Sequence, residues 1–183
     1  MDKLTLDTNV LIDWGWCEGR LEVKRYDNDE AKREELRHLF TALKAFRDEG
    51  ICEFGVTTVL YADYSETSGN VSPPIQDMIG SYVDLALPSI FGFPLVFPTV
   101  FADEQEAVSI FREVFPHSKP GHKRYNKNWK DAGQLYAHKV AGRDFFITAD
   151  KAIISKRLQL AQNWGIEVRT LNEYVLEKQS RQL

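Results

Sequence analysis

The sequence contains few cysteines, no long apolar segment free of proline, and no excess of positive charge. Cys17 and Cys52 are the only cysteines, and neither belongs to a C-x-x-C pair, so neither a disulfide framework nor a thiolate zinc site is expected. The uncharged run of residues 85–101 contains three prolines and is shorter than the about 20 residues of a membrane-spanning helix. The first residues lack a basic segment followed by an apolar one, which predicts no secretory signal. These absences together predict a cytoplasmic protein without a membrane partner.

The composition is that of an ordinary folded domain. Of the 183 residues, 43% are hydrophobic and 27% are charged, which excludes a disordered or collagen-like chain. This length predicts a single domain over residues 1–183. The net charge of -4 argues against a protein that coats nucleic acid through bulk charge. Neither a G-x-G-x-x-G run nor a phosphate-binding P-loop occurs, so a nucleotide cofactor is not expected.

Short apolar runs alternate with longer segments of helical periodicity. We expect an α/β fold of three α/β/α layers around a central, mostly parallel, five-stranded sheet, because such alternation is typical of a parallel sheet covered on both faces. The expected strands are residues 4–6, 51–56, 95–100, 144–148 and 166–170. The expected helices are one whose first turn is residues 10–12, then residues 28–49, 57–65, 75–87, 103–115, 129–140, a segment after 150, and 171–178, with a loop over 116–128.

Four aspartates fall where the expected topology brings strand ends together. Asp7 and Asp150 closely follow strands, Asp63 lies on the helix after the second strand, and Asp131 begins a helix. Because ligands of open α/β sheets bind beyond the carboxyl ends of the strands, these acids are expected at one crevice. Converging carboxylates require a cation, and hard oxygen ligands favour Mg²⁺ or Mn²⁺ over zinc. A cation held in this way supports hydrolysis of phosphodiesters.

Two motifs resemble those of a known family. The run LDTNVLID at residues 6–13 resembles the opening motif of PIN-domain nucleases, and FITADK at residues 146–151 resembles their late strand-to-acid motif. The resemblance spans residues 4–170. It implies a PIN-like fold, a metal-binding quartet of Asp7, Asp63, Asp131 and Asp150, and polar side chains at Asn9 and Thr148 that orient carboxylates or water. It further implies a Mg²⁺- or Mn²⁺-dependent endoribonuclease.

The chain departs from the PIN pattern in two respects. The family usually has Glu at the second acidic position, where this chain has Asp63, and Glu66 follows on the same helical face, so either acid is a candidate ligand. Extra length near residues 68–93 and 116–129 distinguishes the chain from the small VapC-type toxins of the family. An antitoxin partner and a homodimer both remain open.

A basic run precedes Asp131. Residues 117–130 hold five Lys or Arg and no acid, together with two large aromatic residues. Cations neutralise phosphates and aromatic rings stack on unpaired bases, so the run predicts a site for single-stranded RNA. The alternative is a solvated loop. The candidate RNA-binding residues are Lys119, Lys123, Arg124, Tyr125, Lys127, Trp129 and Lys130.

Other interpretations remain beside the nuclease. Asp7 and Asp150 are each placed to cap a helix, which would give them a structural role only. A catalytically inactive PIN-like module would bind RNA or a protein partner without cleaving it. A phosphatase with an aspartyl nucleophile is disfavoured, because that chemistry requires an acid two residues after the first, where this chain has Asn9.

Overall fold

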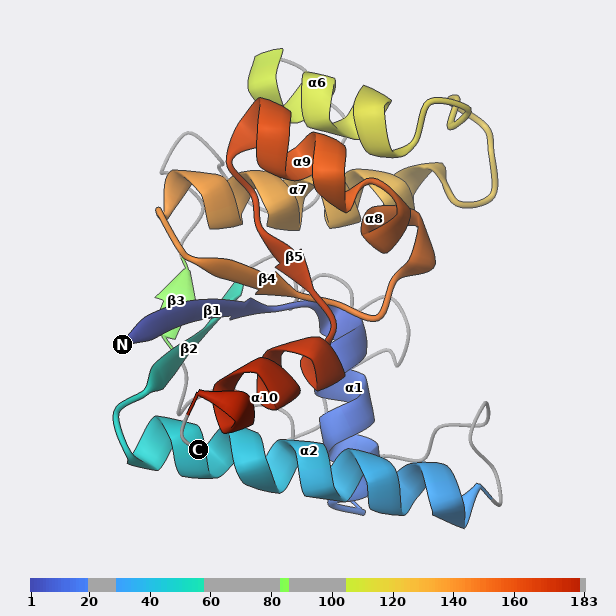
Figure 1. Cartoon of the computed structure of the whole chain (residues 1–183). Coiled ribbons are helices and arrows are strands. Elements are labelled where there is room, and N and C mark those ends of the chain that lie inside the picture. The colour runs from blue at the N-terminus through green and yellow to red at the C-terminus, as the bar shows by residue number, and fades with distance from the viewer. Residues whose placement is uncertain (20–28, 58–82, 86–104, 182–183) are drawn as a thin grey trace.

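A parallel sheet forms the centre of the computed structural model, which describes residues 1–19, 29–57, 83–85 and 105–181 (Figure 1). Its strands are β1 (Asp2–Leu6), β2 (Cys52–Thr57), β3 (Val83–Leu85), β4 (Phe145–Ile147) and β5 (Val168–Arg169). They pair in the order β3-β2-β1-β4-β5, and each of these pairings is parallel. The predicted α/β class with a parallel sheet is therefore confirmed, and β1 occupies the centre of the sheet.

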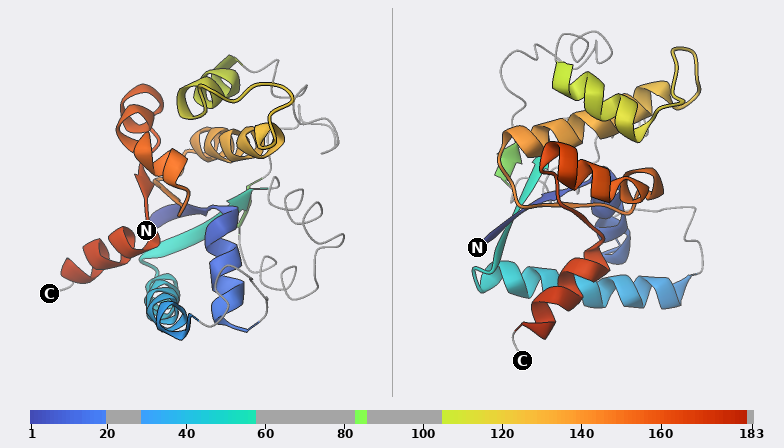
Figure 2. Two further views of the ribbon diagram at one scale, coloured as in Figure 1. Left: turned by 90° about the vertical axis from the view of Figure 1, so that its right-hand side faces the viewer. Right: turned by 45° about the horizontal axis from the view of Figure 1, so that its top comes forward.

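Helices cover both faces of this sheet (Figures 1 and 2). The described helices are α1 (Thr8–Cys17), α2 (Glu30–Asp48), α6 (Gln105–Val114), α7 (Tyr125–Val140), α8 (Lys151–Ser155), α9 (Arg157–Trp164) and α10 (Leu171–Ser180). Helices α1, α2 and α10 lie on one face, and α6 to α9 lie on the other. Each face has its own apolar core, because successive side chains of a strand point to opposite sides.

The alternation along β1 and β4 decides which side chains face α7. Leu4, Leu6 and Ile147 belong to the core beneath α1, α2 and α10, whereas Phe146 belongs to the core beneath α6 and α7. Thr5 lies between Leu4 and Leu6 and contacts His138 of α7. The polar residues that follow β1 are thereby brought next to α7.

Several predicted boundaries need correction. The predicted helix over residues 75–87 is wrong at its end, because residues 83–85 form β3, paired with β2. Helix α7 begins at Tyr125 and not at residue 129. The predicted strand 95–100 and most of the predicted helix 57–65 lie outside the described residues. The early start of α7 follows from packing, since the Tyr125 ring lies edge-on against Phe111 of α6 at 5.7 Å.

Candidate active site

Asp7 lies where the central strand ends. It follows β1 directly, and its backbone N–H donates to the carbonyl of Ile147, the last residue of β4, at 3.0 Å. The Thr148 hydroxyl donates to Asp7 Oδ2 at 2.6 Å, and Asn9 Nδ2 donates to the same oxygen at 3.3 Å. The structure thus brings Asn9 and Thr148 to Asp7, with both side chains placed to orient its carboxylate.

The Asp7 carboxylate is buried. Its exposed fraction is 1%, and Oδ1 has no hydrogen-bond partner among the described residues. Burial is the largest influence on its pKa and raises it; the Thr148 hydrogen bond lowers the pKa, the Asp150 carboxylate raises it, and the net pKa lies above the usual value. Asp7 also occupies the N-cap position of α1 without making a side-chain cap hydrogen bond. The capping interpretation is therefore wrong for Asp7.

Asp150 follows β4 and combines two contacts. Its Oδ1 accepts from the backbone N–H of Ala152 at 2.8 Å and of Ile153 at 3.4 Å, which caps α8. Its Oδ2 lies 3.6 Å from Lys127 Nζ. The Asp150 backbone N–H donates to the Thr148 hydroxyl at 2.9 Å, so that hydroxyl connects Asp150 to Asp7. Asp150 is a helix cap and also a member of the polar group around Asp7.

Helix α7 presents a polar stripe to the end of β1. The spacing of Lys127, Asp131, Gln134 and His138 places them on one helical face. Asp131 is 3% exposed, and Gln134 and His138 are fully buried. Gln134 Nε2 donates to the Thr8 hydroxyl at 3.1 Å. The stripe therefore runs alongside the residues that surround Asp7.

His138 and Gln134 are absent from the predicted site. His138 Nδ1 lies 2.8 Å from the Thr5 hydroxyl, and burial lowers the pKa of the imidazole to about 3. The signal that identifies both residues is the helical spacing of polar side chains after Lys127, on a face that packs against a buried strand. Such a face is ordinarily apolar.

Lys127 stands between two of the predicted acids. Its Nζ lies 3.6 Å from Asp131 Oδ2 and 3.6 Å from Asp150 Oδ2. Burial lowers the pKa of Lys127, but the carboxylates of Asp131, Asp150 and Asp7 together raise it by more, so the net pKa lies above the usual value. Lys127 is therefore a cation at the carboxyl edge of the sheet.

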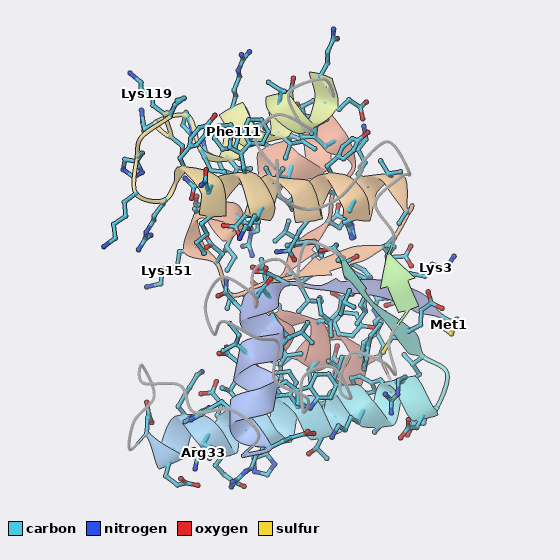
Figure 3. All side chains as sticks on the ribbon, turned by 180° about the vertical axis from the view of Figure 1, so that it is seen from behind. Met1, Lys3, Arg33, Phe111, Lys119 and Lys151 are labelled. Atoms are coloured by element: carbon cyan, nitrogen blue, oxygen red, sulfur yellow. The ribbon has the colours of Figure 1, made fainter. Side chains whose placement is uncertain are left out.

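A surface groove opens beside these acids. Its volume is about 640 Å³. Its lining combines three cations with one acid, one aromatic ring and small or amide side chains, namely Asn9, Phe115, Arg124, Lys127, Asn128, Ala149, Asp150, Lys151 and Ala152. The labelled Lys119 and Lys151 project on one side of the molecule, near the start of α7, whereas Met1 and Lys3 lie on the other side (Figure 3). The groove is therefore lined by three cations and one carboxylate.

The structure separates the predicted RNA-binding residues into two groups. Lys119, Lys123 and Arg124 are exposed, and Tyr125 is half-buried. Trp129 is 5% exposed and stacks on Phe111 with ring centroids 4.1 Å apart, while Lys130 is 3% exposed. The inclusion of Trp129 and Lys130 is corrected, because α7 turns both residues into the interior.

The two candidates for the second predicted acid, Asp63 and Glu66, both lie outside the described residues. Among residues 1–19, 29–57, 83–85 and 105–181, no group of three His, Cys, Asp or Glu side chains is arranged to hold one metal ion.

The local chemistry nevertheless fits a hard divalent cation. The donors around Lys127 are carboxylate oxygens, the ligand type that Mg²⁺ and Mn²⁺ prefer. The buried Asp7 Oδ1 has a free acceptor position among the described residues, and a positively charged ammonium already lies between Asp131 and Asp150. As they are arranged around Lys127, these acids do not form a three-acid metal site; Asp7, Asp131 and Asp150 would hold the ion once Lys127 has left and their carboxylates have closed on it.

Comparison of the chain with models of known protein families and with curated proteins found no match. In the part of the chain that the structure describes, no helix combines the length and apolar character needed to cross a bilayer.

Proposed function

We propose that this chain is a PIN-like, Mg²⁺- or Mn²⁺-dependent endoribonuclease that hydrolyses phosphodiester bonds in single-stranded RNA. One observation carries the proposal: Asp7, buried at the end of the central strand, shares a polar network with Asp150, which Lys127 connects to Asp131. Within the α/β class, we propose a three-layer, PIN-like fold, because such a fold agrees with this geometry.

The side chains of the site have different roles in the proposed reaction. Thr148 and Asn9 fix the orientation of the Asp7 carboxylate through their hydrogen bonds. Arg124 and Lys151 line the groove next to Asp150, where they would neutralise phosphates of the bound strand. A divalent cation held by the aspartates would activate water and stabilise negative charge on the reacting phosphate.

The test is cleavage of a single-stranded RNA by the wild-type chain and by Asp7→Asn. Asn keeps the size of the side chain but removes the negative charge, so we expect a loss of activity of at least about 100-fold. Asp48→Asn is the matched control, because this acid is exposed at the end of α2, where it forms a surface ion pair with Arg47. It should cleave as the wild type does.

Stability measurements separate lost chemistry from lost structure. Because burial raises the pKa of Asp7, the charged carboxylate is unfavourable in the fold, and Asp7→Asn should melt no lower than wild type in EDTA. Cleavage that survives this substitution, or that continues unchanged in EDTA, would contradict the proposal.

A catalytically inactive module that binds RNA is the second candidate. The position of Lys127 favours it, since an ammonium between Asp131 and Asp150 already neutralises the acids without a metal. This candidate predicts RNA binding without turnover in Mg²⁺ and Mn²⁺, and binding that Asp7→Asn leaves unchanged. An antitoxin-like partner or a second copy of the chain are further proposals that size measurements in solution would test.

A further inference from the structure

Lys127 has two sets of neighbours. Its ammonium lies at equal distances of 3.6 Å from Asp131 Oδ2 and Asp150 Oδ2. The residue also lines the groove, together with Arg124, Lys151 and Asp150 itself. The same side chain thus contacts the acids and faces the groove in which the other cations lie.

The contacts of Lys127 to the two acids are long. Charge-assisted hydrogen bonds are typically about 2.7–2.9 Å long, and both Lys127 distances are longer than this. The side chain is 49% exposed, and lysine carries its charge on a flexible four-carbon stem. The ammonium can therefore leave the acids by rotation of its own side chain, without movement of α7.

A divalent cation and the ammonium compete for one position. Both are attracted to the space between Asp131 and Asp150, and their like charges oppose occupation by both at once. The buried Asp7 Oδ1, with no hydrogen-bond partner among the described residues, gives the divalent cation an additional oxygen that Lys127 does not use.

We propose that Lys127 is a built-in counter-ion that occupies the cation position of the metal-free chain, yields it to a divalent metal ion, and then neutralises an RNA phosphate in the groove. This inference rests on the proposed function, because it assigns a regulatory and positioning role within the same site. Metal binding and RNA binding are thereby coupled through one side chain.

Removal of the Lys127 charge should strengthen metal binding. When a competing state occupies a site, the apparent dissociation constant equals the intrinsic one divided by the fraction of molecules in which the site is open. We expect Lys127→Met to bind Mn²⁺ roughly 10-fold more tightly than the wild type, as measured by calorimetry on the full chain. Lys127→Arg, which keeps the charge, should remain close to wild type.

Two controls make the metal measurement specific. Lys32→Met removes one positive charge from α2, on the other face of the sheet, and should leave the Mn²⁺ affinity unchanged. Asp7→Asn should abolish binding if the ion occupies the proposed site. Equal Mn²⁺ affinity of wild type and Lys127→Met, with binding lost in Asp7→Asn, would overturn the lysine role and leave the metal site standing. Absence of Mn²⁺ binding in both wild type and Lys127→Met would overturn both proposals.

RNA-binding measurements test whether the Lys127 ammonium moves to an RNA phosphate when a divalent ion is bound. With Ca²⁺ in place of Mg²⁺ or Mn²⁺, Lys127→Met should weaken binding of a single-stranded RNA several-fold, and in EDTA it should have little effect. Lys123→Met, which changes an exposed lysine before α7, should weaken binding to the same extent in both conditions. An equal effect of Lys127→Met with and without Ca²⁺ would show that the lysine does not move, and would overturn the coupling.

Discussion

Buried polar side chains that make few hydrogen bonds to the described residues lie next to β1. His138 is fully buried, its Nδ1 contacts Thr5, and its Nε2 has no hydrogen-bond partner among the described residues. Its ring lies edge-on to Phe146 at 5.6 Å. Nearby, the guanidinium of Arg143 donates to the Leu4 carbonyl at 2.9 and 3.2 Å. Burial and the positive charge of Arg143 lower the pKa of the imidazole, and the Asp144 carboxylate, which raises it, does not offset them, so His138 is held neutral.

The neutral state of His138 should make the fold sensitive to acid. Its pKa is lowered from 6.5 to about 3 in the folded chain, so below pH 6.5 the unfolded chain binds a proton that the folded chain does not. This contribution to stability is complete above pH 6.5 and is lost as the pH falls toward 3, at up to about 1.4 kcal/mol per pH unit. His138→Gln should flatten the dependence of the unfolding free energy on pH between 4 and 6.5, as measured by urea titrations.

The control for this measurement is His38→Gln, because the His38 side chain is 78% exposed on α2. It should keep the wild-type slope. An identical slope for His138→Gln and wild type would show that His138 does not titrate differently in the folded and unfolded chains.

At the scale of the elements, helical periodicity and helix-capping residues can be recognised in the sequence and predict where elements lie. The apolar steps of α2 and the short apolar run of β4 predict their position, and Thr170 with Glu173 forms a capping box that begins α10. The ends of β1 and β4 also place Asp7 and Asp150 correctly, because residues that follow neighbouring parallel strands must lie at one edge.

The start of α7 could not be predicted from the sequence in the same way. Residues 116–128 look like a loop because they are polar and contain Pro120 and Gly121, yet the helix begins at Tyr125. Long-range packing on α6 decides this start, and it buries Trp129 and Lys130. The ion pair between Lys127 and Asp150 likewise depends on the approach of α7 to α8, and no local sequence pattern predicts that approach.

The contact between α6 and α7 yields a prediction about Trp129. Its ring stacks on Phe111 with an interplanar angle of 6°, so Trp129→Phe should lower the free energy of unfolding by about 1–2 kcal/mol through lost packing. RNA affinity should not change, because a buried ring is unavailable to a base. Chemical denaturation and fluorescence anisotropy measure the two quantities. A large loss of RNA affinity at unaltered stability would return Trp129 to the binding surface.

At the scale of the whole molecule, the charge is unevenly distributed. The chain has 27 acidic and 23 basic residues, yet residues 117–130 contain no acid. Exposed cations from this run lie at the start of α7, and Lys151 projects on the same side of the molecule (Figure 3). The acidic remainder repels a polyanion, so a bound RNA strand should be confined to this side.

This confinement predicts how RNA binding responds to salt. Each phosphate of a single strand that a cation neutralises contributes about -0.7 to the slope of log affinity against log salt. Lys123→Gln with Arg124→Gln should therefore reduce the steepness of that slope by about 1.4. Lys32→Gln with Arg181→Gln also removes two exposed cations, but these lie on α2 and at the end of α10, and the slope should stay as in wild type. Equal slopes for the two double variants would mean that the run before Asp131 is only solvated surface, and that RNA, if it binds, uses another face.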